Sequence, residues 1–356
     1  MKLLIQPADG VGPLVAAIRN ARKSVDIVIF RFDRAELEAG LKAAVGRGIV
    51  VSALIAYANR GGEKSLRKLE MRLLGAGVNV SRTADDLERY HDKLLIIDRR
   101  VLYALSFNFT HLDIDHSRGF GIVTKKAGLV QEALKLFEAD VARKPYEAGI
   151  DTFLVSPVNA RKQLAALIQR AKKELLIYDP KVADRAMLRA LNNRIEKGVV
   201  VKVIGGVGRK SRLLDVRPLS GLRLHTRTII RDRREVFVGS QSLRVAELDS
   251  RREVGIIVRE SKVVSGLVQA FEKDWERKKV DEEAQATPRE IKKRLKTMVE
   301  KLSPLNPLVK EAVSEVISKV GGEALDSKEM KVTVEKAVKE AVRERVAEML
   351  NESKVD

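Results

Sequence analysis

The sequence HDKLLIID occupies residues 91–98, and the related sequence HTRTIIRD occupies residues 225–232. Each begins with a histidine, has a cation two residues later and ends in an aspartate. Each is followed by small polar residues, in SFN at 106–108 and in GSQS at 239–242. A pattern of this length that recurs within one chain indicates an internal duplication.

Sequence blocks around the two motifs repeat as well. Residues 21–30 resemble 171–178, and residues 47–55 resemble 197–204, both at an offset of 150. From the histidines onward the offset is 134, because the first copy carries a charged stretch near Lys64–Leu74 that the second copy lacks. We therefore divide the chain into two repeats, residues 1–142 and 143–280, and an extension, residues 281–356.

Each repeat alternates short apolar strands with amphipathic helices. The stretches Val25–Phe30 and Ile49–Ile55 are apolar and rich in β-branched residues, which is typical of buried strands. Their counterparts in the second repeat are Leu175–Tyr178 and Val199–Ile204. Continuous apolar strands separated by helices predict an α/β fold, in which each repeat forms a mixed sheet covered by helices.

Residues 281–356 differ in character from the two repeats. Thr287-Pro288 marks a helix start, and apolar residues recur at helical spacing from Val309 to Val320 and from Val334 to Leu350. We expect a helical C-terminal extension that docks on the repeats or mediates self-association.

One glycine-rich segment, GGVGRK at residues 205–210, could be mistaken for a phosphate-binding loop. It lacks the spacing of a P-loop. We predict a flexible loop near the mouth of the site.

Composition restricts the class of protein. The chain has 356 residues and no cysteine, which excludes disulfides, thiolate metal sites and a cysteine nucleophile. No stretch approaches the ~20 apolar residues of a membrane-spanning helix, so we expect a cytoplasmic protein that associates with membranes at most peripherally. Lys and Arg number 68 against 49 Asp and Glu, and the excess lies on residues 1–280. This positive field favours a polyanionic partner.

The residues of the two motifs have the chemistry of a phosphate site. Residues two apart on a strand project from one face, so His91 faces the same way as Lys93, and His225 the same way as Arg227. Cations and small polar donors bind phosphate oxygens, and an imidazole can attack phosphorus or deliver a proton. The returning strands add further polar groups, namely Ser106, Asn108, Ser240 and Ser242.

The spacing His-x-Lys-x4-Asp followed by Gly-Ser-x-Asn resembles the motif of the phospholipase D superfamily, and both repeats fit it. The resemblance implies two pseudo-symmetric halves with one shared site, a phosphohistidine intermediate and no metal or other cofactor. It implies that His91 is the nucleophile and His225 the general acid. The implied phosphate ligands are Lys93, Asn108, Arg227 and Ser242, with Ser106 and Ser240 beside them. The implied structural residues are Asp98 and Asp232.

The motifs depart from the family pattern at three places. Arg227 replaces the family lysine, Ser242 replaces asparagine, and Leu105 replaces a glycine in the first motif. Arginine keeps the positive charge, but it is longer and planar, so the exchange is not neutral.

Family members also carry an acidic residue that orients the histidine of the other half. Glu253 fits this role for His91, whereas the aligned position in the first repeat is Gly119. His225 therefore lacks such a carboxylate unless Asp113 or Asp115 substitutes. A histidine without this partner is held less firmly in tautomer and orientation. We expect one well-equipped nucleophile and one weakened partner in a catalytic set of His91, Lys93, His225, Arg227 and Glu253.

Three functions are compatible with these residues. The first is phosphodiester hydrolysis or phosphatidyl transfer on phospholipid, as in the cardiolipin synthase-like branch. The second is a metal-independent nuclease or nucleic-acid phosphodiesterase. The third is a catalytically weak protein that binds nucleic acid or an anionic membrane. Aromatic residues make up only 4% of the chain, which counts against both an interfacial aromatic belt and base stacking. We place phospholipid first, because chains with two such motifs more often resemble the lipid branch.

Overall fold

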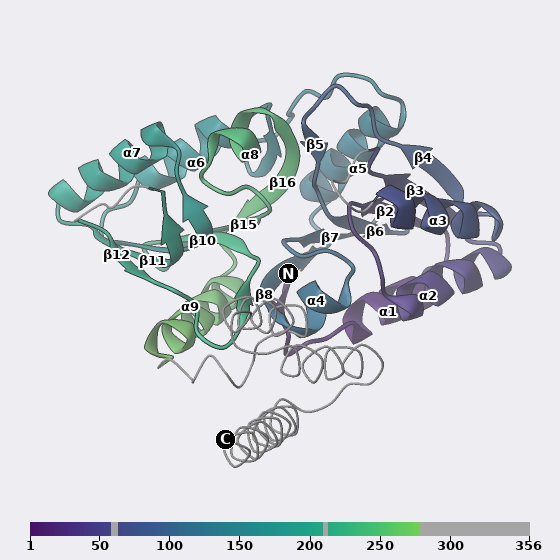
Figure 1. Ribbon diagram of the computed structural model, residues 1–356, viewed down its shortest axis with the longest axis horizontal. Helices are drawn as coiled ribbons and strands as arrows, with labels where there is room; N and C mark the ends of the chain where they lie inside the picture. The colour runs from purple at the N-terminus through teal and green to yellow at the C-terminus, as the bar shows by residue number, and fades with distance from the viewer. Residues whose placement is uncertain (58–62, 209–212, 278–356) are drawn as a thin grey trace, which may run out of the picture. The chain divides into compact units, whose positions relative to one another are not determined.

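The computed structural model describes residues 1–57, 63–208 and 213–277, which belong to one compact unit, Met1–Arg277 (Figure 1). Within this unit the same succession of strands and helices occurs twice. The arrangement confirms the predicted α/β fold with two pseudo-symmetric repeats. The predicted helical extension, residues 281–356, lies outside the described residues, as does its suggested part in self-association.

The first half is built on a mixed sheet in the order β1-β8-β7-β6-β2-β3-β4. Its strands are β1 (Lys2–Gln6), β2 (Ser24–Ile29), β3 (Val50–Ile55), β4 (Asn79–Arg82), β6 (Leu94–Ile97), β7 (Val101–Leu105) and β8 (Ser117–Thr124). Its helices are α1 (Gly12–Arg19), α2 (Ala35–Gly46), α3 (Glu63–Leu74), α4 (His111–Asp115) and α5 (Ala127–Val141). β2, β3 and β4 run parallel, whereas β6, β7 and β8 pair antiparallel.

The second half repeats this order position by position as β9-β16-β15-β14-β10-β11-β12. Its strands are β9 (Phe153–Ser156), β10 (Glu174–Val182), β11 (Val200–Val207), β12 (Asp215–Arg217), β14 (Arg227–Arg231), β15 (Glu235–Gly239) and β16 (Arg251–Val258). Its helices are α6 (Ala160–Gln169), α7 (Arg185–Glu196), α8 (Val245–Asp249) and α9 (Ser261–Glu276). No described residue between β11 and β12 is helical, so α3 has no counterpart there, which accounts for the change of offset along the sequence.

The apolar side chains form three clusters that define the layers. α1, α2 and α3 pack on one face of the first sheet, and α6 and α7 pack on the corresponding face of the second. The remaining faces of both sheets share a central cluster with α5 and α9. In this cluster the ring of Tyr178 meets those of Phe120 and Phe271 edge to face, at centroid distances of 5.3 and 5.1 Å. The two halves therefore share one core.

One short strand precedes each histidine and pairs with the sheet of the opposite half. β5 (Arg89–Tyr90) of the first half pairs with β16, and β13 (Arg223–Leu224) of the second half pairs with β8. The backbone N–H of His91 then donates to the carbonyl of Arg252 (2.7 Å), and that of His225 donates to the carbonyl of Arg118 (3.2 Å). Each histidine is thus held by the sheet of the opposite half.

The same two arginines join the halves through buried ion pairs. Arg118 Nε lies 2.7 Å from Asp274 Oδ2, and Arg252 Nη2 lies 3.0 Å from Asp140 Oδ1. All four side chains are buried. The hydroxyl of Tyr178 also donates to Asp274 (2.8 Å). Removing one partner of such a pair leaves a buried charge without compensation, which is strongly unfavourable.

The glycine-rich segment that we predicted to be a flexible loop is partly a strand, so this prediction was wrong for its first residues. Gly205 and Gly206 belong to β11, and residues 209–212 lie outside the described residues. Gly205 has φ +136°, and a Cβ atom there would lie 1.9 Å from the carbonyl oxygen of Asp179. The glycine is therefore required by the close approach of two strands.

We expect Asp274→Ala to lower the free energy of unfolding by about 3–5 kcal/mol, because Arg118 would stay buried without its carboxylate. Urea unfolding of the full chain, followed by circular dichroism, measures the change. Asp215→Ala is the control, because Asp215 is exposed and lies 3.9 Å from Arg217, and its loss should change the free energy by less than ~0.5 kcal/mol. Equal losses in the two variants would contradict the importance of the buried pair.

Candidate active site

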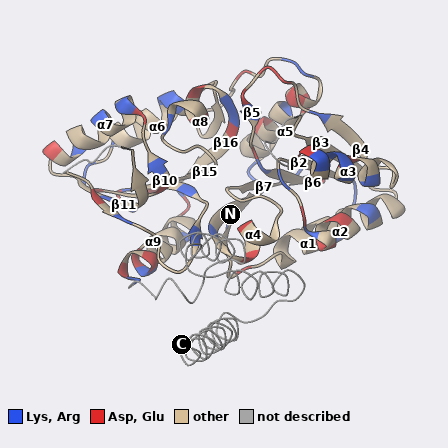
Figure 2. Ribbon diagram, viewed as in Figure 1, with Lys and Arg blue, Asp and Glu red and all other residues tan. Residues whose placement is uncertain are grey.

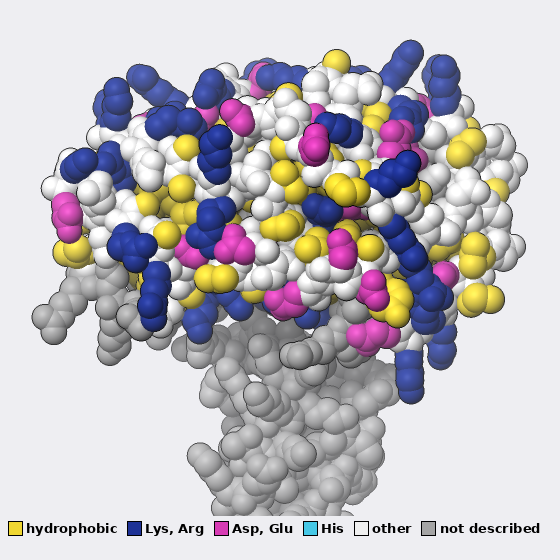
Figure 3. Space-filling view, turned by 90° about the horizontal axis from the view of Figure 1, so that it is seen from above, with side chains coloured by type: hydrophobic (Ala, Val, Ile, Leu, Met, Phe, Trp, Pro, Cys, Tyr) yellow, Lys and Arg dark blue, Asp and Glu magenta, His cyan; other side chains and the backbone are white. Residues whose placement is uncertain are grey.

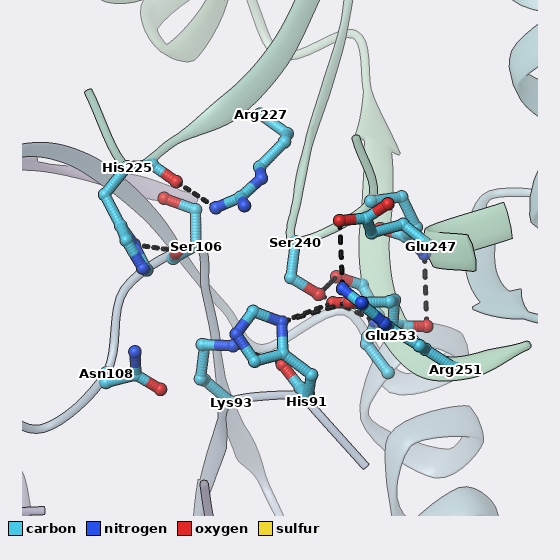
Figure 4. Close-up of polar contacts among 12 residues, drawn as sticks. His91, Lys93, Ser106, Asn108, His225, Arg227, Ser240, Glu247, Arg251 and Glu253 are labelled. Atoms are coloured by element: carbon cyan, nitrogen blue, oxygen red, sulfur yellow. Dashed lines mark hydrogen bonds and ion pairs between the residues drawn. The ribbon is translucent and has the colours of Figure 1, made fainter. Parts of the chain in front are cut away.

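His91 lies between β5 and β6 and is held by a carboxylate from the other half. Its Nδ1 is 2.8 Å from Oε2 and 3.0 Å from Oε1 of Glu253, which comes from β16 and is fully buried (Figure 4). Nδ1 therefore donates to Glu253, and Nε2 carries the lone pair. Among the described residues Nε2 has no hydrogen-bond partner. The nitrogen that a nucleophilic imidazole would use is thus left available.

One cation accompanies each histidine. Lys93 Nζ donates to the carbonyl of His91, and Arg227 Nη1 donates to the carbonyl of His225, so each cation folds back on its own motif. Lys93 is only 1% exposed, and Nε of Arg227 is buried without a hydrogen-bond partner in the described residues. Figure 4 shows the four side chains arranged around one space, with contributions from both halves.

Burial shifts the titration of the groups around His91. Desolvation, followed by the charge of Lys93, lowers the pKa of His91 well below its ordinary value, so the ring is neutral near pH 7. Desolvation also lowers the pKa of Lys93 to about 7 and raises that of Glu253 to about 7. The site therefore holds a neutral imidazole and a cation close to losing its proton, and a bound anion would stabilise the charged form of Lys93.

His225 is held differently. Its Nδ1 donates to the backbone carbonyl of Ser106 (2.9 Å), and its Nε2 lies 3.4 Å from Oδ2 of Asp113. Asp113 comes from α4 of the first half and also accepts from Arg223 Nη1 (2.6 Å). Desolvation lowers the pKa of His225, and Asp113 opposes this shift. Asp113 therefore occupies the neighbourhood of His225, although it approaches Nε2 rather than Nδ1.

The structure explains why no carboxylate occupies position 119. A Cβ atom on Gly119 would lie 2.9 Å from Cδ1 and 3.0 Å from Cβ of Phe107, a fully buried side chain. The counterpart of Phe107 in the second half is Gln241, which donates to the carbonyls of Leu154 and Glu253. In the first half, the aromatic ring of Phe107 thus fills the space beside position 119.

The predicted phosphate ligands Asn108 and Ser242 lie near the site, but each donates to a buried carboxylate. Asn108 donates to Asp113 from its backbone N–H (2.9 Å) and from Nδ2 (2.6 Å). Ser242 Oγ donates to Asp179, which also accepts from the N–H of Leu243 (2.7 Å). Asp179 was missed by the sequence reasoning. The one sequence feature that could have indicated Asp179 is the presence of a carboxylate at the end of an otherwise apolar strand.

The hydroxyl groups of Ser106 and Ser240 form hydrogen bonds with backbone groups of the neighbouring strands. Ser106 Oγ accepts from the N–H of Phe120 (2.9 Å), and Ser240 Oγ lies 3.3 Å from the carbonyl of Val254. Both serines are fully buried. These two residues anchor the polar segment to β8 and β16 beside the histidines.

The aspartates that end the two motifs brace hairpins. The carboxylate of Asp98 accepts from the N–H groups of Arg22, Lys23 and Ser24, and that of Asp232 accepts from the N–H groups of Lys172, Lys173 and Glu174. Both residues have φ +53°, which a tight hairpin turn requires. Burial alone would raise the pKa of each carboxyl group, but the backbone donors lower it below its ordinary value. Each aspartate ties the hairpin to the start of the central strand.

Basic side chains are spread over both halves (Figure 2). On the face shown in Figure 3 they are scattered among acidic and hydrophobic side chains, and no histidine is visible there. His91 and His225 are 9% and 6% exposed. No helix within residues 1–57, 63–208 and 213–277 combines the length and apolar character needed to cross a bilayer.

Comparisons with known proteins agree with this geometry. The family model described as "Cardiolipin synthase, PLD-like domain" matches residues 14–141 and 164–275, one stretch in each half. Among solved structures, polyphosphate kinase from Porphyromonas gingivalis has a TM-score of 0.66 at 19% identity, over 76% of this chain and 46% of that chain. Phosphatidylserine synthase from Haemophilus influenzae Rd KW20 has a TM-score of 0.60 at 11% identity, over 88% and 94%. A search of curated proteins found no match.

The two solved structures share the fold with this chain, which spans less than half of the polyphosphate kinase. The family match includes both motifs, residues 91–98 and 225–232, and confirms the predicted superfamily. The chain belongs to the phospholipase D superfamily, in the family of cardiolipin synthase, PLD-like domains.

Proposed function

We propose that this protein transfers the phosphoryl group of a phosphodiester through a covalent phosphohistidine on His91, with phospholipid as the first substrate class. The observation that carries the proposal is the orientation of His91. Glu253 holds Nδ1 and so leaves the lone pair of Nε2 available beside two cations, the buried Lys93 and the half-buried Arg227. A positioned neutral imidazole among cations is suited to attack on a phosphate anion.

The reaction has two steps. In the first, Nε2 of His91 forms a bond to phosphorus as the bond from phosphorus to the leaving alkoxide breaks, and His225 gives that oxygen a proton. In the second, His225 takes a proton from water or an alcohol, which attacks phosphorus, and the bond from phosphorus to Nε2 breaks. Hydrolysis and transfer differ only in the incoming hydroxyl group. No redox change occurs in either step.

The cations stabilise the charge on the phosphate oxygens in the transition state. Removing one such preorganised donor commonly costs about 10²–10³-fold in kcat. Asp113 acts as a positioning residue for His225, since its negative charge favours the protonated ring. When the phosphate binds, its negative charge, like that of Asp113, opposes the lowering of the pKa of His225 and favours the protonated general acid.

Phospholipid is the first substrate class because the matched family is described by cardiolipin synthase. A phospholipid would be reached by peripheral contact with an anionic bilayer, to which the positive charge of residues 1–277 is attracted. Hydrolysis and phosphatidyl transfer are both compatible with the two-step mechanism. We place this reaction in the cytoplasm.

Nucleic acid is the second substrate class. The observation that favours it is the group of arginines near His91, which includes Arg31 and Arg89. The third candidate function is binding of nucleic acid or membrane without turnover. It is considered because the second motif departs from the family pattern at Arg227 and Ser242.

His91→Ala should lower the hydrolysis of bis(4-nitrophenyl) phosphate by at least about 10³-fold, because the nucleophile is lost. His225→Ala should still form the phosphoenzyme, since 4-nitrophenolate leaves without a proton, but should release it slowly. A burst of 4-nitrophenolate and an adduct on His91, found by mass spectrometry, measure this difference. His116→Ala is the control, because His116 is exposed and outside the site. Full activity of a clean His91→Ala preparation would refute the mechanism.

The pH dependence of kcat/KM should reflect the loss of the proton from Lys93. Its pKa is lowered to about 7, so the cation is lost as the pH rises through that value and kcat/KM should fall on the alkaline side. Lys93→Arg keeps its charge over this range and should remove the alkaline decline, although its overall rate is lower. Both profiles are measured as rates between pH 5 and 9, with a phosphodiester whose leaving group does not change its charge over this range. If the alkaline decline persists in Lys93→Arg, the titration of another group must cause it.

The substrate class is tested with phosphatidylglycerol vesicles and with single- and double-stranded DNA, without divalent metal. We expect the lipid to be cleaved and His91→Ala to be inactive on it. Cleavage of DNA alone would replace phospholipid with nucleic acid. Salt-sensitive binding of DNA with no turnover of either substrate would favour the binding protein.

A further inference from the structure

Among the described residues, three cations lie close to the ring of Phe30, which packs against the proposed nucleophile. The ring centroids of Phe30 and His91 are 4.5 Å apart in an edge-to-face arrangement. The cationic groups of Arg31, Arg89 and Lys93 lie 5.7, 5.4 and 5.5 Å from the centroid of Phe30. Phe30 follows β2, and Arg89 lies on the crossing strand β5. Like charges are thus gathered immediately beside His91.

The two arginines of this group form no direct ion pair with a carboxylate in the described part of the chain. Arg31 is exposed, whereas Arg89 is half-buried. Burial, followed by the charge of Arg251, lowers the pKa of Arg89. Arg251 itself forms ion pairs with Glu88 (2.8 Å) and Glu247 (3.0 Å). The charges of Glu88 and Glu253 act on Arg89 from a distance, but no carboxylate pairs directly with either arginine in the described part of the chain, and Arg31 is accessible.

The second half provides an internal comparison. The position of Phe30 is taken by Pro180, and that of Arg31 by Lys181. The counterpart of Arg89 is Arg223, whose guanidinium pairs with Asp113 at 2.6 Å and also donates to Ser117 at 3.0 Å. Among the described residues, the ring and a pair of arginines without a direct ion pair are found only on the side of His91. Duplication by itself does not account for them.

The location of the arginines indicates which part of a substrate they would meet. In an in-line displacement the leaving group departs on the side opposite the nucleophile, where His225 provides the proton. Groups beside His91 therefore face the part of the substrate that stays bonded to the enzyme. Phe30 is 2% exposed, so its ring cannot stack on a base. Guanidinium groups bind phosphate oxygens in a bidentate manner.

We infer that Arg31 and Arg89, arranged around Phe30, form a subsite for a second phosphate, carried by the part of the substrate that remains on His91. This inference rests on the proposed function, because it assumes that His91 attacks phosphorus. The subsite is suited to a chain of repeating phosphates, such as a nucleic-acid strand or inorganic polyphosphate. A phospholipid with a single phosphate would leave it empty. Its test therefore also bears on the choice of substrate.

Titration calorimetry of the full chain with tripolyphosphate and with orthophosphate measures the subsite without turnover. We expect tripolyphosphate to bind at least about tenfold more tightly than orthophosphate. Arg31→Gln/Arg89→Gln should reduce this ratio to near one, and Arg31→Lys/Arg89→Lys should retain part of it. Lys181→Gln, the mirror position in the second half, should leave the ratio unchanged. Circular dichroism verifies that each variant is folded.

A ratio near one in the unmodified protein would overturn the inference, as would a high ratio that survives in the double Gln variant. Because binding is measured directly, loss of the ratio is distinguishable from failure of the proposed function, which the His91→Ala experiment tests separately. Competition with octathymidylate and with long-chain polyphosphate then identifies the source of the second phosphate. The source is the ligand whose affinity falls about tenfold or more in the double Gln variant. If neither affinity falls, the subsite is refuted.

Discussion

The exchange of β5 and β13 between the halves is the constraint on which the site depends. Through it the backbone of His91 is bonded to Arg252, and the side chain of Arg252 is bonded to Asp140 in the first half. The mirror arrangement links His225, Arg118 and Asp274. One arginine in each half thus fixes both a histidine backbone and the contact between the halves. A shift of one half against the other would break buried ion pairs and move both imidazoles, so the site is as rigid as the shared core.

The same symmetric frame supports two unlike histidines. In the second half β16 supplies Glu253, which reaches Nδ1 of His91. In the first half the ring of Phe107 lies against Gly119, and Nδ1 of His225 donates to a carbonyl group instead. A carboxylate on Nδ1 increases the basicity of Nε2, which suits a nucleophile. A carbonyl group fixes the tautomer with less effect on basicity, which suits a group that must give up its proton in one step and regain it in the next.

Much of this arrangement follows from the sequence, because its signals are local or repeated. The duplication and the α/β class follow from motif spacing and from the alignment of one repeat on the other, and the contact between Glu253 and His91 was implied by the resemblance to the family. Other features depend on partners distant in the chain. Asp179 is reached by Ser242 only through the packing of β10 against the polar segment after β15. Gly205 is needed because a strand passes at close range, and the glycine pattern alone equally indicates a loop. The hydrogen bonds of Asn108 and Ser242 to carboxylates depend on geometry that no spacing encodes.

Charge balance connects the site with its surroundings. The buried carboxylates Glu253, Asp113 and Asp179 accept hydrogen bonds from His91, Asn108 and Leu243 respectively. By contrast, no ion pair is formed in the described part of the chain by Lys93, Arg227, Arg31 or Arg89. Positive charge therefore exceeds negative charge around His91, and such an excess is stable only where an anion or water compensates it. In the proposed mechanism a single phosphate between the histidines would compensate Lys93 and Arg227, whereas Arg31 and Arg89 lie beside Phe30, 5.7 and 5.4 Å from its ring centroid. Water can compensate these two side chains in the free protein, and a second negative group on a bound ligand would take its place at the proposed subsite.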